Sequence, residues 1–338
     1  MFDKNEWAEF QLPTQRNKLL WVMNVCWKGG TGLWALECIR EMPIWQHTVV
    51  WLNGEPDISV HNEFLEAGVD IAKVDNITKD LVKEIKPSGI ILSNTDPSRI
   101  LEGQEWLTSN FNVVYVHHST VRPWLAGAAV DVFVSEHLRT QYRNLESRMR
   151  SVLVCPPIGE IGRYLNIRRV EQARCVVGRI SSDNKDKFPV EQLEILKATG
   201  CPCLVVGGEK YWGAPPDNFQ YPDFGSQSVS SLLSQIDIFV YRTNLTETWG
   251  RTITEAMASG IPVVCEKRGG PAEQIRHGID GFLCDTDAEF IEKIQLLATD
   301  QNLRFRMGKH AREKAKQLAN SNFKNKIEPI LIKNALRG

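Results

Sequence analysis

Two glutamates with seven residues between them, Glu247 and Glu255, form the clearest chemical pattern in this sequence. An apolar run at 236–241 predicts a buried strand before them, and the residues from about Gly250 to Gly260 predict a helix. A carboxylate accepts two hydrogen bonds from neighbouring sugar hydroxyls, and a helix N-terminus at the edge of a parallel sheet favours anions. The pattern therefore predicts a nucleotide-sugar site.

Basic side chains follow a second apolar run. Arg179 comes directly after the strand predicted at 175–177, and Lys185 and Lys187 lie in the polar loop beyond it. A guanidinium and an ammonium at one sheet edge can neutralise a diphosphate leaving group. The alternative is a solvated loop, and the neighbouring glutamates favour the site.

Two adjacent histidines, His117 and His118, follow the strand predicted at 113–116. Ligands bind at this end of the strands in open α/β sheets, and a neutral imidazole there can hydrogen-bond a sugar or a phosphate. Successive side chains of extended backbone point in opposite directions, so only one ring can face the cleft. We choose His117; a packing role in the loop is the alternative.

A glycine loop at the start of the first predicted helix supports a rival function. Gly30-x-Gly32-x-x-Ala35 matches the dinucleotide fingerprint of NAD-dependent dehydrogenases, and Glu55 follows the second predicted strand. The fingerprint requires an acid at the end of the second strand itself, whereas Glu55 lies beyond that end, about 25 residues after Gly30. The glycines are equally explained by a tight turn and a close approach of helix to strand.

Apolar runs alternate with amphipathic segments along the whole chain and restart after a polar join near residues 156–172. This alternation predicts an α/β protein with two Rossmann-like, doubly wound parallel sheets. Among the expected elements are helices around 100–108 and 136–145, with weak order at 211–224. On the helix after Gly250, Glu255 lies opposite the apolar stripe, so it is functional only if another domain covers that side.

The bulk composition is that of a soluble globular protein. Its 338 residues are 42% hydrophobic and 24% charged, with a net charge of −1, so nucleic acid is not expected as a partner. The eight cysteines lie mostly in apolar runs without zinc-ligand spacing, which predicts no metal and a reducing, cytoplasmic setting. Neither a signal peptide nor a membrane span is expected. The arginines of residues 139–150 suit either a solvated face or a weak peripheral membrane contact.

The sequence TETWGRTITEAMASGIPVV, with its Glu-x7-Glu spacing, resembles the signature of retaining family-4 glycosyltransferases of GT-B fold. The resemblance extends over nearly the whole chain. Other segments that carry it are Lys28-Gly29-Gly30, Val116-His117, Gly178-Arg179-Ile180, Arg268-Gly269-Gly270-Pro271-x-Glu273 and Gly278-x-x-Gly281-Phe282.

The resemblance implies a role for each matching residue. Glu255 would hold the ribose and Glu247 the donor sugar, while Arg179 and Lys187 would bind the diphosphate and His117 the sugar near the reacting carbon. Donor contacts would come from Gly30, Lys185, Trp249, Gly250, Arg251 and Thr252. The resemblance also implies a retaining reaction without metal or cofactor.

The domains expected from the resemblance are an acceptor-side domain of residues 1–157 plus about 320–338, and a donor-binding domain of residues 158–319. The final helix would cross back onto the first domain. The donor is expected to be a UDP-linked hexose such as UDP-glucose, and the acceptor a saccharide or lipid-linked molecule in surface-glycan or exopolysaccharide synthesis. Thr248 departs from the usual glycine after the first glutamate. A non-catalytic nucleotide-sugar binder of the same fold is a further alternative.

Overall fold

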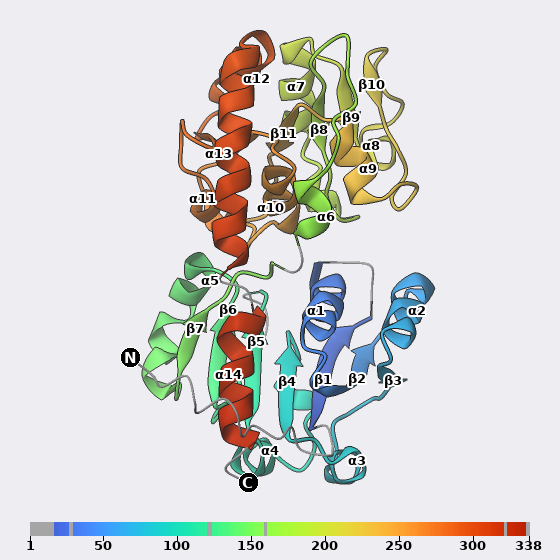
Figure 1. Cartoon of the computed structure of the whole chain (residues 1–338), viewed down its shortest axis with the longest axis vertical. Helices are drawn as coiled ribbons and strands as arrows, with labels where there is room; N and C mark the ends of the chain where they lie inside the picture. Colours follow the sequence, from blue (N-terminus) through green and yellow to red (C-terminus); the bar gives the residue numbers. More distant parts are fainter. Residues whose placement is uncertain (1–16, 27–29, 120–123, 159–160, 321–322, 336–338) are drawn as a thin grey trace, which may run out of the picture.

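The computed structural model describes residues 17–26, 30–119, 124–158, 161–320 and 323–335. Two parallel sheets, each covered by helices, lie one above the other along the long axis of the molecule (Figure 1). We call the part built around the first sheet, together with the last helix, the first domain, and the part built around the second sheet the second domain. The predicted α/β class with two doubly wound sheets is confirmed.

The first sheet has the order β3-β2-β1-β4-β5-β6-β7 in the described residues, and its paired strands are all parallel. Its strands are β1 (Lys18–Val25), β2 (Gln46–Asn53), β3 (Asp70–Lys73), β4 (Gly89–Ser93), β5 (Val113–His117), β6 (Val130–Phe133) and β7 (Val152–Val154). The central strands β4 and β5 are buried at every position, as expected for a sheet covered on both faces.

The first sheet is covered by short helices. They are α1 (Gly30–Glu41), α2 (Ile58–Glu66), α3 (Lys79–Ile85), α4 (Glu105–Asn110), α5 (Glu136–Gln141) and the 3-10 turns at Pro97–Arg99 and Arg143–Arg148. Two expected helices differ from these bounds. The helix expected around 100–108 begins only at Glu105, after a 3-10 turn at Pro97–Arg99 and a non-helical stretch, and the helix expected over 136–145 ends at Gln141.

The second sheet has the order β10-β9-β8-β11-β12-β13 in the described residues. Its strands are β8 (Val177–Arg179), β9 (Cys203–Val205), β10 (Phe219–Gln220), β11 (Ile238–Tyr241), β12 (Val263–Glu266) and β13 (Gly281–Cys284). Its helices are α7 (Val190–Thr199), α8 (Gly208–Trp212), α9 (Val229–Ser234), α10 (Arg251–Ala258), α11 (Gly269–Gln274), α12 (Asp287–Thr299) and α13 (Gln301–Ala319), with a 3-10 turn at Lys185–Lys187. The region 211–224, expected to be weakly ordered, contains the end of α8 and the edge strand β10.

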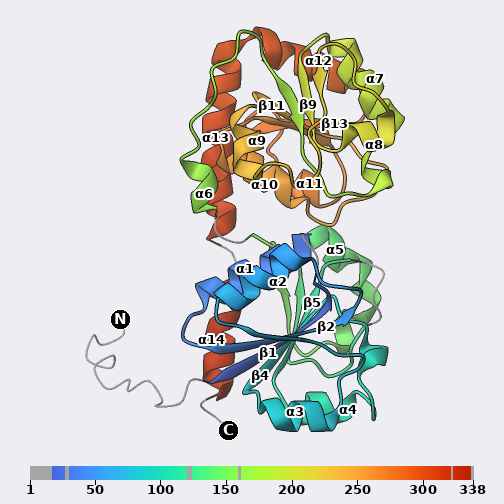
Figure 2. The ribbon, with the colours of Figure 1, turned by 90° about the vertical axis from the view of Figure 1, so that its right-hand side faces the viewer.

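Two segments connect the domains. The polar join contains a short helix, α6 (Gly162–Leu165), which the sequence analysis did not predict. The chain returns after α13 as α14 (Phe323–Ala335), which lies beside the first domain (Figures 1 and 2). Phe323, Ile327 and Leu331 of α14 are buried in the apolar core that contains Trp21 and Trp34. Within the described residues, no helix combines the length and apolar character needed to cross a membrane.

Candidate functional site

A pocket of about 260 Å³ lies between the two domains, where strands of both sheets end. The first domain contributes residues after β5 and at the start of α1, and the second domain contributes the loop between β11 and α10. The lining residues are Gly30, Thr31, His118, Val134, Pro157, Ser181, Ser182, Lys187, Tyr241, Glu247, Thr248, Trp249, Gly250, Arg251 and Thr252. Most of the predicted site residues therefore meet at one place.

Glu247 is held by two groups within the pocket. Lys187 Nζ lies 2.8 Å from its Oε2, and the Tyr241 hydroxyl donates to the same oxygen at 2.5 Å. Burial alone would raise the pKa of Glu247, but Lys187 and the hydrogen bond from Tyr241 lower it below its usual value. Burial, followed by the nearby Glu247 charge, raises the pKa of Tyr241 far above its usual range. Glu247 is therefore an ionised acceptor and Tyr241 a neutral donor.

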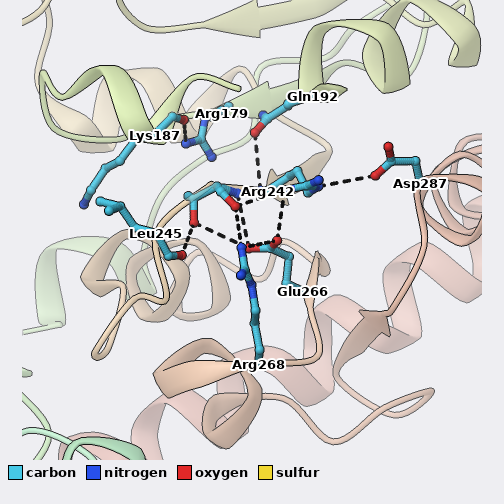
Figure 3. Close-up of polar contacts among 9 residues, drawn as sticks. Arg179, Lys187, Gln192, Arg242, Leu245, Glu266, Arg268 and Asp287 are labelled. Carbon is cyan, nitrogen blue, oxygen red and sulfur yellow. Dashed lines mark hydrogen bonds and ion pairs between the residues drawn. The ribbon is translucent and has the colours of Figure 1, made fainter. Parts of the chain in front are cut away.

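Arg179 lies at the end of β8, next to the backbone carbonyl of Lys187 (Figure 3). Arg179 is 0% exposed. Its guanidinium lies between two aromatic rings: the distance from Cζ to the ring centroid is 4.7 Å for Tyr241 and 5.4 Å for Phe188. Nη2 donates to the carbonyl of Lys187, whereas Nε and Nη1 have no hydrogen-bond partner among the described residues. Burial lowers the pKa of Arg179 to about 10, which leaves the side chain charged at neutral pH.

The two candidate lysines differ in position. Both lie on the 3-10 turn Lys185–Lys187, two positions apart. Lys187 lines the pocket, while Lys185 is exposed and does not belong to the lining. Of the two, Lys187 is the one positioned to meet a diphosphate in this pocket.

The start of α10 supplies the backbone side of the pocket. Gly250 occupies the N-cap with φ 83°, a conformation that favours glycine, and no side chain caps the first turn. Trp249 is buried, and Gln274 Nε2 donates to its carbonyl at 2.6 Å. In the first turn of α10 the Ile253 N–H already donates to the Gly250 carbonyl at 3.0 Å, so the N–H groups that can meet an anion are those of Arg251 and Thr252.

The start of α11 packs against the Glu247 loop. The N–H of Gly270 donates to the Glu247 carbonyl at 2.9 Å, and a Cβ at Gly270 would lie 2.1 Å from the Thr248 carbonyl oxygen. The two backbones approach so closely that only glycine fits. The α11 segment thus holds the backbone of the Glu247 loop in place. The sequence analysis did not predict this contact.

A carboxylate at the end of β12, Glu266, fixes the turn that follows β11 (Figure 3). Its Oε2 accepts the N–H of Thr243 at 3.2 Å, and its Oε1 accepts Arg242 and Arg268 at 3.2 and 2.8 Å. The sequence analysis missed Glu266 and Tyr241. Each is a polar residue at the carboxyl end of an apolar strand, Tyr241 in β11 and Glu266 in β12, and this position was the signal that could have identified them.

Glu255 faces away from its own sheet, toward the first domain. It lines a narrow recess beside the main pocket, together with Pro157, Ile158, Ile161, Tyr164, Arg251 and Thr254. Its Oε1 lies 3.4 Å from Nη2 of Arg251. Burial, with a contribution from Glu37 in the first domain, raises the pKa of Glu255, and Arg251 opposes this shift.

The histidine positions differ from the sequence prediction. His117 is 1% exposed, its Nε2 forms a hydrogen bond of 2.8 Å with Asp131 Oδ1 and its ring stacks on Phe133, so it does not reach the pocket. His118 lines the pocket instead. The reason is strand alternation. The strand β5 extends through His117, whose ring packs against Phe133, and the next side chain, that of His118, points to the opposite side. Burial lowers the pKa of His118 to about 3, which keeps its ring neutral.

The dehydrogenase alternative receives no support from Glu55. This side chain is 86% exposed and pairs with Lys73 at 2.7 Å, instead of facing a ribose at the first sheet edge. Lys28 and Gly29 of the glycine loop lie outside the described residues, and Gly30 borders the pocket between the domains. In the part of the chain that is described, no cluster of His, Cys, Asp and Glu side chains has the arrangement of a metal site.

Part of the second domain is similar in sequence to known proteins. Residues 214–314 match the family model for glycosyl transferases group 1. The putative glycosyltransferase YtcC of Bacillus subtilis (strain 168) is 31% identical over 96 residues, which are 28% of this chain and 24% of that protein. N-acetyl-alpha-D-glucosaminyl L-malate synthase of Bacillus anthracis is 38% identical over 89 residues, 25% of this chain and 23% of the relative. The matches thus span about a quarter of these relatives' lengths.

Similarity to solved structures extends over both domains. Anabaena Alr3699/HepE in complex with UDP-glucose has a TM-score of 0.72 at 17% identity, with 95% of this chain and 98% of that chain covered. A glycosyltransferase from Rickettsia africae ESF-5 has a TM-score of 0.77 at 15% identity, with 96% and 100% covered. At these identities the similarity establishes the fold.

Proposed function

We propose that this protein transfers a sugar from a nucleotide diphosphate sugar to an acceptor, because residues 214–314 match the family model for glycosyl transferases group 1 and the two-sheet GT-B fold is shared with solved glycosyltransferases. The observation that carries the proposal is the pocket between the domains. There an ionised carboxylate, a lysine and an uncapped helix N-terminus converge. These groups match the sugar hydroxyls and the diphosphate of such a donor.

The proposed donor position assigns each group one contact. Glu247 accepts hydrogen bonds from the sugar hydroxyls, and Glu255 from the ribose. Lys187 exchanges its partner Glu247 for the diphosphate, which also meets the first turn of α10. Arg179, buried behind Lys187, stabilises the negative charge that develops on the diphosphate. His118, as a neutral ring, hydrogen-bonds the sugar from the first domain.

We propose a retaining reaction that uses no metal. The bond between the anomeric carbon and the diphosphate oxygen breaks, and its electron pair leaves with the diphosphate. The acceptor hydroxyl oxygen then bonds to the anomeric carbon from the same face, and its proton passes to the leaving diphosphate oxygen. Lys187 and Arg179 provide the two positive charges that a metal ion would otherwise supply at the leaving group.

UDP-glucose is our proposed donor, since a protein of the same fold has been solved with UDP-glucose. A saccharide or lipid-linked acceptor in surface-glycan synthesis is the proposed setting. The eight cysteines are all free thiols, seven of them buried, which supports the proposal of a reducing, cytoplasmic compartment.

The donor is tested first by a thermal-shift series with UDP, GDP, ADP and their sugars, because a bound ligand raises the melting temperature. The best donor is then incubated with saccharide acceptors, with and without EDTA, and the anomeric configuration of the product is read by NMR. The proposal expects retained configuration and EDTA-insensitive turnover. Inverted product contradicts the mechanism, and EDTA inhibition contradicts metal independence. If the protein binds a nucleotide sugar tightly but neither transfers the sugar nor slowly hydrolyses the donor, it is a non-catalytic binder.

A further inference from the structure

Glu37 is a buried acid in the middle of an apolar helix. It lies on α1, between residues that belong to the core of the first domain, and it is itself only 6% exposed. The buried neighbours are Trp34, Ala35, Leu36, Cys38 and Ile39. Removing a carboxylate from water costs several kcal/mol unless cations compensate it. A glutamate at this position therefore requires partners, and their location indicates what it does.

The cationic partners of Glu37 both lie outside the first sheet and its helices. Nη2 of Arg251, at the start of α10 in the second domain, lies 2.9 and 3.1 Å from the two carboxylate oxygens. Nη2 of Arg163, on α6 in the connecting segment, lies 3.3 Å from Oε1. Figures 1 and 2 show α1 on the side of the first domain that faces the second. Glu37 thus joins the two domains by a buried ionic contact.

Arg251 connects this contact to the proposed donor site. The same guanidinium donates to the Gly30 carbonyl at 3.0 Å and approaches Glu255 at 3.4 Å, and the residue lines the main pocket. Burial alone would lower the pKa of Arg251, but Glu37, followed by Glu255, raises it above its usual value. Arg251 therefore stays charged, and its position is set by a residue of the opposite domain.

A second, uncharged contact crosses the pocket. Thr248 Oγ1, in the loop after Glu247, donates to the His118 carbonyl at 2.8 Å. Thr248, which stands where the family that this chain resembles usually has glycine, therefore joins the two domains through its side chain. It provides an independent way to loosen the same interface without changing any charge.

We propose that Glu37 is a positioning residue that fixes Arg251 and holds the two domains closed over the donor, at the cost of donor affinity. This proposal rests on the proposed function. In the closed arrangement Glu37 and Glu255 balance the charges of Arg251 and Arg163. Without Glu37 the site gains one net positive charge, which attracts a diphosphate, while the domains lose their main ionic contact.

The test compares Glu37→Gln with wild type by calorimetry with UDP, by small-angle X-ray scattering and by steady-state kinetics. Glu63→Gln is the matched control, because Glu63 pairs with Arg40 at 3.3 Å on the exposed surface of the same domain. We expect Glu37→Gln to bind UDP at least as tightly as wild type, to show a larger radius of gyration, and to lose at least tenfold in kcat. Thr248→Val should increase the radius of gyration without tightening UDP binding.

Two results overturn the proposal: an unchanged radius of gyration and kcat in Glu37→Gln, or UDP binding that weakens in parallel with kcat. If Glu37→Gln does not fold, Glu37→Met replaces the carboxylate by an apolar side chain of similar length that suits the surrounding core. Failure of the proposed function is distinguishable, because wild type would then show no turnover while scattering and calorimetry still report on Glu37.

Discussion

Lys187 Nζ lies 2.8 Å from Glu247 Oε2, although sequence reasoning assigned these two side chains to different parts of one ligand. Both side chains are 16% exposed, so the ion pair is shielded from water on most sides. The lysine comes from the turn after β8 and the glutamate from the loop after β11. The pair therefore keeps both charges in place, and the proposed donor separates them by inserting its diphosphate and sugar.

The first prediction concerns the energy of this pair. A double-mutant cycle of Lys187→Met and Glu247→Gln, measured by urea unfolding without ligand, should give a coupling energy of about 1–3 kcal/mol. Lys187→Met alone should be the more destabilising single change, because it leaves a buried carboxylate without its cation. The pair Lys197 and Glu194, exposed on α7, is the matched control and should couple by less than about 0.5 kcal/mol. A coupling equal to this control would contradict the burial argument.

The second prediction is that Arg179 costs stability in return for activity. Its charge is buried, two of its nitrogens lack partners, and no carboxylate lies within ion-pair distance among the described residues. Replacing it with an apolar side chain of similar length removes a buried charge that no carboxylate pairs directly. Arg179→Met should therefore melt at the same temperature as wild type or higher, while kcat/KM falls by about 100-fold or more. Calorimetry and initial rates measure the two effects.

The control for this variant is Arg306→Met, which changes an exposed arginine on α13. It should alter neither the melting temperature nor the rate. A large loss of stability in Arg179→Met would mean that the contacts of the guanidinium with Tyr241 and Phe188 outweigh its desolvation.

The third prediction concerns pH. Because burial lowers the pKa of His118 from its usual 6.5 to about 3, the unfolded chain binds more protons than the folded protein between these values. The free energy of unfolding should therefore rise with pH across this window. Above pH 6.5 the ring is neutral in both states, so His118 should no longer lower the stability. His118→Gln should flatten the stability curve between pH 4 and 6 by up to about 1.4 kcal/mol per pH unit. Equal slopes in both proteins would place the His118 ring in water.

The repeating pattern of apolar and amphipathic segments was sufficient to predict the two-sheet architecture. Continuous apolar runs such as β4 and β5 are typical of strands covered on both faces, and they lie where the pattern placed them. Short elements were less predictable, since α6 and α11 are too short to show a helical period.

The candidate site was predictable where chemistry depends on residue type and strand ends. The Glu247 loop, Lys187 and the start of α10 meet as the pattern suggested. The choice between His117 and His118 depended on the last residue of β5, a boundary that sequence cannot locate to one position. Glu37 was missed because its partners come from the other domain and from the connecting segment, and an isolated acid in an apolar helix shows only that some partner exists.

The final prediction concerns a third contact between the domains. Glu273, on α11, accepts the backbone N–H of Glu136 at 3.0 Å and that of His137 at 2.5 Å, so a side chain of the second domain caps α5 of the first. Glu273→Gln keeps only one acceptor and places an amide donor against the other N–H. Loss of one cap is worth about 1 kcal/mol, so hydrogen exchange of these two amides should accelerate by about fivefold. Glu292→Gln, at an exposed position on α12, should leave exchange in α5 unchanged. Wild-type protection of α5 in Glu273→Gln would show that the two domains do not make this contact in solution.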